Sequence, residues 1–182
     1  MNNIVLHLMV NNECTNDCPL CCNKQYDVGK IPVVTVEELK QTETICITGG
    51  EPFLSKNLIS FLENLFKSYV SIKNCIIYTS GGLLNAINLR LLLKIQKEQC
   101  VNIGLSIGPK SLGDRNNLRF KSDIINNILR QLATNRLYCF TEADIKISEY
   151  YKDSNIDIID RKWQKDFVPA PNTIFRRLPI WI

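Results

Sequence analysis

The chain has no apolar run long enough to cross a membrane, and its first residues lack the basic segment and cleavage site of a secretion signal. We therefore expect a cytoplasmic protein without membrane contact, whose cysteines stay reduced. Low-complexity linkers and internal repeats are also absent, and hydrophobic residues make up 45% of the 182 residues. This balance excludes disordered and fibrous chains, and it predicts a single domain over residues 1–182.

A broad basic face is also missing. The net charge is +4, but residues 1–160 are neutral because the whole excess lies in the last 22 residues. Proteins that coat nucleic acid carry a wide basic surface, so no nucleic-acid partner is expected.

The C-terminal segment, residues 160–182, is basic and aromatic, with Trp163 and Phe167 near its start and an apolar end at Leu178-Pro179-Ile180-Trp181-Ile182. We expect it to pack on the core, because its apolar end would otherwise be exposed to water. A further hypothesis is that Arg176 or Arg177 binds an anionic substrate group at the mouth of a site.

Short apolar runs alternate with amphipathic stretches of helix length. Strands are predicted at residues 4–10, 44–48, 74–80, 101–107, 137–141 and 155–159. Helices are predicted at residues 36–41, after a Thr35/Glu38 capping box, and near residues 58–66, 84–97 and 124–132. The alternation predicts an α/β fold with a mainly parallel sheet, in which ligands bind at the carboxyl ends of the strands.

The cysteines are numerous for a reducing compartment, and Cys14, Cys18, Cys21 and Cys22 fall within nine residues after the first predicted strand. The C-x3-C-x2-C spacing of Cys14, Cys18 and Cys21 allows three thiolates to bind one metal centre. A structural zinc ion needs a fourth ligand, which would have to be a distant cysteine because no second Cys/His pair lies nearby. A [4Fe–4S] cluster held by three thiolates leaves one iron open to another ligand, which is useful for catalysis.

This loop resembles the signature of the radical S-adenosylmethionine (radical SAM) enzymes. Cys14, Cys18 and Cys21 match the three cluster ligands, and Asn23 is a common residue at its position in the family. Leu20 departs from the pattern, since an aromatic residue is common before the third cysteine.

Three further segments resemble the same family. Thr48-Gly49-Gly50-Glu51-Pro52 is similar to its GGE motif at the end of the second strand. Tyr78-Thr79-Ser80-Gly81-Gly82 is similar to the turn after its third strand. Residues 102–107 resemble its fourth strand, in which Ser106 would contact the adenosyl ribose.

The resemblance implies a shortened or partial (βα)6-type radical SAM barrel with a mainly parallel sheet. It implies a [4Fe–4S] cluster on the three cysteines and S-adenosylmethionine beside Gly49, Gly50 and Glu51, with the Glu51 carboxylate near the methionine ammonium. Reductive cleavage of S-adenosylmethionine would then give a 5′-deoxyadenosyl radical that abstracts hydrogen from a small-molecule or peptide substrate. An electron donor such as flavodoxin or ferredoxin is implied as a partner.

Other functions stay open at this point. Within the family, the chain could be similar to 7-carboxy-7-deazaguanine synthase or to an activase of glycyl-radical enzymes. Outside it, the chain could be a non-catalytic iron–sulfur protein, or a zinc protein that uses Cys14, Cys18, Cys21 and one distant cysteine. The sequence names no substrate and no catalytic residue, and His7, the sole histidine, is interpreted as a hydrogen-bonded interior residue.

Overall fold

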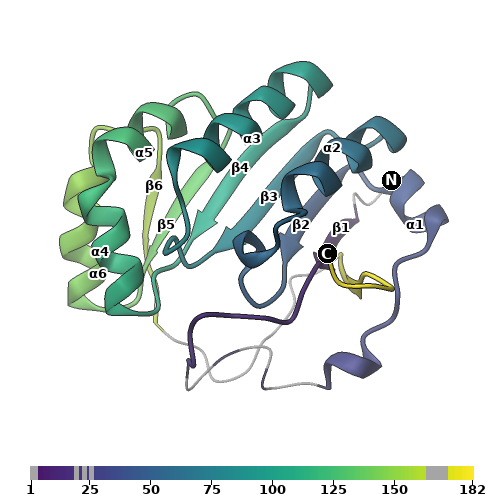
Figure 1. Ribbon diagram of the computed structural model, residues 1–182, viewed down its shortest axis with the longest axis horizontal. Coiled ribbons are helices and arrows are strands. Elements are labelled where there is room, and N and C mark those ends of the chain that lie inside the picture. Colours follow the sequence, from purple (N-terminus) through teal and green to yellow (C-terminus); the bar gives the residue numbers. More distant parts are fainter. Residues whose placement is uncertain (1–3, 19–20, 22–23, 25–26, 163–171) are drawn as a thin grey trace.

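Seven parallel strands form one sheet in the computed structural model, and helices cover one face of it (Figure 1). The structure describes residues 4–18, 21, 24, 27–162 and 172–182. Leu20, Cys22 and Asn23 of the cysteine loop, and Trp163 and Phe167 of the C-terminal segment, lie outside the described residues.

The strands and helices occupy the following residue ranges, in chain order. The strands are β1 (Val5–Met9), β2 (Thr44–Thr48), β3 (Asn74–Thr79), β4 (Asn102–Ile107), β5 (Asn135–Cys139), β6 (Asp157–Asp160) and β7 (Thr173–Arg177). The α-helices are α1 (Val36–Gln41), α2 (Leu58–Ser68), α3 (Ala86–Gln99), α4 (Leu112–Phe120), α5 (Ser122–Leu129) and α6 (Glu142–Ser148). Short 3-10 helices are η2 (Val28–Lys30), η3 (Pro52–Leu54) and η4 (Glu149–Tyr151).

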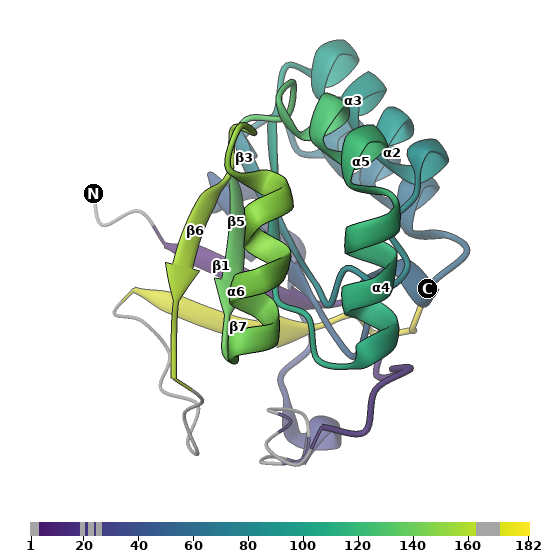
Figure 2. The same cartoon turned by 90° about the vertical axis from the view of Figure 1, so that its left-hand side faces the viewer.

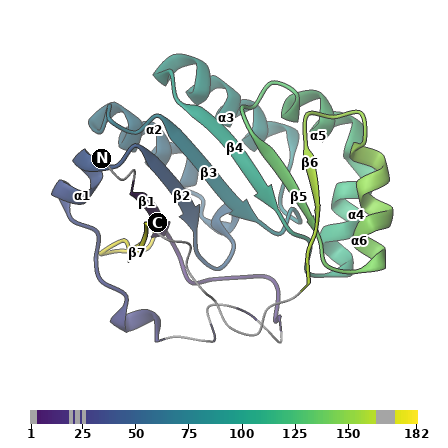
Figure 3. The same cartoon turned by 180° about the vertical axis from the view of Figure 1, so that it is seen from behind.

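The order of the strands is β6-β5-β4-β3-β2-β1-β7. From β1 to β6 each strand lies beside the preceding one, so the helical connections cross the same face of the sheet. Figure 3 shows the opposite face, which none of the α-helices in the described residues covers, and Figure 2 shows how far the strand direction turns between β6 and β7. Among the described residues, no pairing joins these two edge strands, so the sheet is open.

The core lies between the sheet and the helices. Side chains alternate along each strand, and Leu6 and Leu8 of β1 are completely buried on the helix-bearing side. Leu62 of α2 and Leu89 of α3 cover this side and are also completely buried. Burial of each such side chain stabilises the fold by about 1.5–3 kcal/mol.

Six strands and four helices lie at or near their predicted positions, and the α/β fold with a parallel sheet is confirmed. The predictions missed β7, α4 and α6. β7 (Thr173–Arg177) is a half-buried edge strand with two arginines, and α4 contains only two large apolar residues before Phe120, so neither has a clear periodic pattern. β7 pairs with β1, and Leu178, just beyond it, is buried in the core.

The two arginines of β7 bind within the fold. Arg176 lies on the helix-bearing face, where its Nε and Nη2 contact Oε1 of Glu38 in α1 at 2.8 and 2.6 Å. Arg177 donates to the carbonyl oxygens of Ile31 and Leu178 at 3.1 Å. The hypothesis that either arginine binds a substrate anion is therefore corrected, because each guanidinium already has partners within the chain.

We predict that Glu38→Gln destabilises the protein by about 1 kcal/mol at pH 7. Glutamine keeps the capping hydrogen bond with Thr35 but loses the charge that pairs with Arg176. The guanidinium lowers the pKa of Glu38, so its contribution is present above the unfolded pKa, about 4.3, and is lost as the pH falls through the folded value.

Urea unfolding at pH 7 and pH 3 measures this effect. The difference from the wild type should shrink at pH 3, and Glu37→Gln, at an exposed position of the same helix, should change little at either pH. An equal loss at both pH values would contradict the ion-pair explanation.

Candidate functional site

Four loops meet at the carboxyl edge of the sheet, because the strands that precede them are parallel and adjacent. They follow β1, β2, β3 and β4, and they contain the cysteine motif, the Gly49–Glu51 motif, the Ser80 turn and the start of α4. The predicted site motifs therefore share one edge, where parallel sheets bind ligands.

The cysteine loop leaves β1 at this edge. Cys14 is exposed, while Cys18 and Cys21 are half-buried. The Cys18 carbonyl oxygen accepts from the Cys21 amide at 3.2 Å. Partial burial raises the pKa of Cys14 and of Cys18, and Cys21 lies close enough to raise both further.

The three thiols are near one another, but they are not arranged as a metal site. The described residues include no group of three or more His, Cys, Asp or Glu side chains with the geometry to hold a metal ion. The donor set still suits a soft metal centre, because three thiolates from one loop are the ligands that iron–sulfur clusters use. Binding would require the thiols to move together and to lose their protons.

The Gly-Gly segment of the β2 loop packs directly against the chain that leads to Cys14. The Gly50 amide donates to the Asn11 carbonyl at 3.1 Å, and the Glu51 amide donates to the Glu13 carbonyl at 2.7 Å. A Cβ atom on Gly50 would lie 1.9 Å from the Glu13 carbonyl oxygen. Only glycine allows this approach, so Gly50 positions the cysteine loop on the end of β2.

Asn11 completes this contact from within the buried interior. Its side-chain nitrogen donates to the Glu51 carbonyl oxygen at 3.1 Å, and its side-chain oxygen accepts from the Gly50 amide at 3.2 Å. The backbones that follow β1 and β2 therefore form one hydrogen-bonded unit. Sequence analysis did not single out Asn11, and a lone asparagine after a strand carries no distinctive signal.

The Glu51 carboxylate is 1% exposed and points toward the end of β3. One oxygen accepts from the Thr79 hydroxyl at 2.8 Å and the Phe53 amide at 3.2 Å, and the other accepts from the Ser80 amide at 2.8 Å. Burial raises the pKa of Glu51, and these hydrogen bonds oppose the rise. The predicted contact between Glu51 and a cofactor ammonium stays a prediction, since an ionised carboxylate accepts about four hydrogen bonds.

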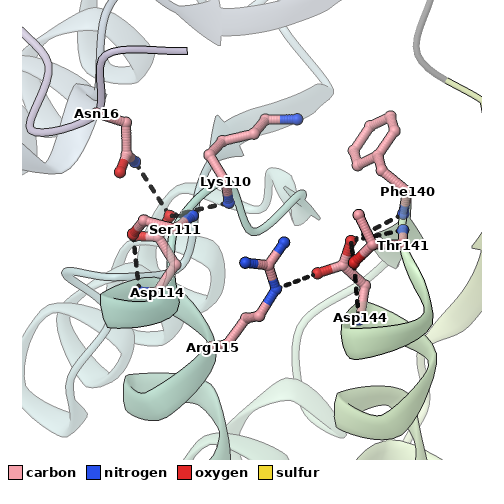
Figure 4. A network of polar contacts seen from close by, with 8 residues as sticks. All are labelled: Asn16, Lys110, Ser111, Asp114, Arg115, Phe140, Thr141 and Asp144. Atoms are coloured by element: carbon pink, nitrogen blue, oxygen red, sulfur yellow. Dashed lines mark hydrogen bonds and ion pairs between the residues drawn. The ribbon is translucent and has the colours of Figure 1, made fainter. Parts of the chain in front are cut away.

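Asp114 extends the polar network to α4 and back to the cysteine loop. It is 3% exposed and accepts from the Ser80 hydroxyl at 3.0 Å and from the side-chain amide of Asn16, within the cysteine loop, at 3.0 Å. It also accepts from the Lys110 and Ser111 amides at 2.9 Å, as Figure 4 shows. The spacing of Ser111 and Asp114 is that of a capping box, a signal that could have identified this site residue.

The same arrangement recurs after β5. Asp144 is completely buried and accepts from the backbone amides of Phe140 and Thr141 and from the Arg115 Nε at 2.7 Å (Figure 4). Arg115 belongs to α4, so this carboxylate holds α4 and α6 together. Removal of either partner would leave a buried charge unpaired.

Ser106 lies on β4, on the face without helices, and is 4% exposed. In the sheet register it lies between Tyr78 of β3 and Arg136 of β5. His7 lies on the same face of β1, with its ring 5.7 Å from that of Tyr78 and 6.5 Å from that of Phe175. Burial lowers the pKa of His7. This face therefore carries aromatic and polar side chains where the other face is apolar.

Comparisons with known proteins add little to this geometry. No family model and no curated protein matches the chain. A crystal structure of Streptococcus suis SuiB has 11% sequence identity and a TM-score of 0.41, and the match covers 87% of this chain and 49% of that one. A structure of SuiB bound to S-adenosylmethionine has 10% identity and a TM-score of 0.41, with 87% and 47% covered.

The chain thus spans about half the length of the solved structures that it matches. At this identity and TM-score, the likeness shows neither a shared family nor a shared activity. Separately, none of the helices in the described residues has the length and apolar character needed to cross a bilayer.

We predict that Gly50→Ala destabilises the protein by about 1–3 kcal/mol, because a methyl group cannot fit beside the Glu13 carbonyl. Gly113→Ala is the matched control: a Cβ atom at Gly113 in α4 would meet the Ser111 Oγ at an ordinary contact distance of 3.6 Å, and alanine favours a helix over glycine, so stability should stay equal or rise. Thermal unfolding of both variants measures the difference, and an unchanged Gly50→Ala protein would contradict the close contact.

Proposed function

We propose that the chain is a radical SAM enzyme. The observation that carries this proposal is the hydrogen-bonded contact between the cysteine loop and Gly50-Glu51 at the carboxyl edge of a parallel sheet. Two motifs 28 or more residues apart, each matching the same family, thus occupy one edge. Loops after adjacent parallel strands meet in any such sheet, so the support comes from these two loops carrying both motifs in the order that the family resemblance implies.

The order of the sheet supports the finer expectation of a partial (βα)6 barrel. Strands β1 to β6 follow one another in sequence, and the α-helices of the described residues lie on one face, as a barrel wall requires. β7 adds a strand at the β1 edge. The face without helices would then be the inner face of the partial barrel.

The chain's own residues would bind and position the cofactors. Cys14, Cys18 and Cys21 are the proposed ligands, and Asn16 connects their loop to Asp114 through a hydrogen bond at 3.0 Å. Gly49, Gly50 and Glu51 are the proposed contacts for the methionine part of S-adenosylmethionine, and Ser106 lies on the proposed inner face for the ribose. Bound there, a [4Fe–4S] cluster supplies the electron for reductive cleavage of S-adenosylmethionine into methionine and a 5′-deoxyadenosyl radical.

The proposed role of Glu51 has two parts. Its carboxylate fixes the turn after β3 through Thr79 and Ser80, and its oxygens have the capacity to accept one further hydrogen bond, which the cofactor would supply. The reaction takes place on a small molecule or peptide, with a flavodoxin- or ferredoxin-like protein as electron donor. The alternative is a zinc protein that uses the same three cysteines, and metal analysis distinguishes it from an iron–sulfur enzyme.

We predict that alanine substitution of Cys14, Cys18 or Cys21 abolishes iron binding after anaerobic reconstitution, since each removes one of three cluster ligands. Cys100→Ala is the control, because Cys100 is exposed at the end of α3, and Cys22→Ala should also retain iron. Iron, sulfide and zinc contents are measured. Full iron loading of Cys18→Ala, or stoichiometric zinc in the wild type, would overturn the assignment.

A second prediction concerns the cofactor. With dithionite, the reconstituted protein should convert S-adenosylmethionine into 5′-deoxyadenosine, measured by chromatography. Glu51→Gln should weaken S-adenosylmethionine binding by about tenfold or more, the effect of losing a charge-assisted hydrogen bond of about 1.5–3 kcal/mol.

Glu43→Gln is the matched control, because Glu43 is exposed and precedes β2 at the opposite edge of the sheet. If folded Glu51→Gln and wild-type protein bind S-adenosylmethionine with equal affinity, Glu51 does not contact the cofactor and only supports the turn after β3. An absence of 5′-deoxyadenosine from the iron-loaded wild type would contradict the proposed activity.

A further inference from the structure

A row of side chains follows β5 along the face without helices. Leu137 and Cys139 of this strand are buried in the core beneath the helices. Arg136 and Tyr138 alternate with them and therefore lie on the other face, where both are half-buried. Phe140 continues the row toward the carboxyl edge, and its ring stacks with Tyr138 at a centroid distance of 6.3 Å.

Arg136 has no hydrogen bond or ion pair with any residue in the described part of the chain. Its register partner on β6 is Asp157, an exposed residue of the same face, and no ion pair joins the two. A guanidinium carries five donors, and the buried side-chain atoms without a partner in the described residues include none of the Arg136 nitrogens. The donors of Arg136 are therefore open to water and available to an anion.

In the sheet register, Arg136 lies in line with Ser106 of β4 and Tyr78 of β3. Its charge lowers the pKa of both Cys46 on β2 and Tyr78 on β3, although burial raises both values overall. Between these strands and β5 lies β4, whose residue beside Tyr78 and Arg136 on this face is the small Ser106. A short side chain at this position does not separate Arg136 from Tyr78.

Two further cations lie along the row. The Arg161 guanidinium is 5.6 Å from the centroid of the Tyr138 ring, and the Lys110 ammonium is 3.8 Å from the centroid of the Phe140 ring. Arg136, Arg161 and Lys110 therefore place positive charge along this face toward the carboxyl edge of the sheet.

We propose that this β5 row, residues Arg136, Tyr138 and Phe140, binds a small anionic molecule whose carboxylate or phosphate pairs with Arg136. A planar guanidinium matches both groups through two parallel hydrogen bonds. The rest of such a molecule would extend along the aromatic side chains toward the cysteine loop. That the anion is the enzyme's substrate rests on the proposed function, whereas binding of the anion does not.

The single histidine provides a direct measurement on the cofactor-free, full-length protein. The His7 ring lies 5.7 Å from that of Tyr78, so its one set of NMR signals reports on this face. Benzoate and inorganic phosphate serve as the probes, and benzamide serves as the uncharged analogue of benzoate. We expect benzoate or phosphate to shift the His7 signal saturably, and benzamide to bind at least tenfold more weakly.

Arg136→Gln should weaken the affinity for the probe that shifts the His7 signal at least tenfold, and Arg136→Lys should retain part of that affinity. Arg90→Gln, which removes an exposed arginine from α3, should leave the affinity unchanged. Circular dichroism establishes that each variant is folded. Absence of saturable shifts with both probes, or equal affinity in wild type and Arg136→Gln, would overturn the proposal.

The experiment needs neither iron nor S-adenosylmethionine, so its result is independent of the cleavage assay. If anions bind at Arg136 but no 5′-deoxyadenosine forms, the anion site is confirmed and its role as a substrate site is contradicted. If cleavage occurs but anions do not bind, only this inference is overturned.

Discussion

The contact between the backbones after β1 and β2 is the constraint on which the rest of the site depends. Glu13 accepts from the Glu51 amide at 2.7 Å, and no side chain larger than hydrogen fits at Gly50 between the two segments. The start of the cysteine loop is consequently fixed to the sheet, although Cys14 itself is exposed. Metal ligands on a loop need such a rigid support, because loops alone position side chains poorly.

Two buried carboxylates extend this support across the sheet. Glu51 connects the ends of β2 and β3, and Asp114 connects the end of β3 to α4 and to Asn16 of the cysteine loop. Ser80 belongs to both connections, since its amide donates to Glu51 and its hydroxyl donates to Asp114. Burial of a carboxylate costs free energy unless its oxygens are hydrogen-bonded. This network therefore strongly favours one arrangement of the four loops.

The sequence predicted the parts of the fold that have strong local patterns. The α1 capping box at Thr35 and the apolar stripe of α2 lie as expected, and so do the runs that form β2 and β4. β7 could not be predicted, because an edge strand with two arginines resembles a polar segment until its pairing with β1 is known. The motifs predicted which segments meet at the carboxyl edge of the sheet, but not that Glu51 would face β3, which depends on contacts between residues far apart in the chain.

The most direct test of the central claim is the electron paramagnetic resonance spectrum of the reduced, reconstituted protein, recorded with and without S-adenosylmethionine. A cluster held by three cysteines has an open iron, so the account predicts a [4Fe–4S] signal that changes when S-adenosylmethionine is added. A protein without a cluster signal, or a signal that S-adenosylmethionine leaves unchanged, would contradict the account.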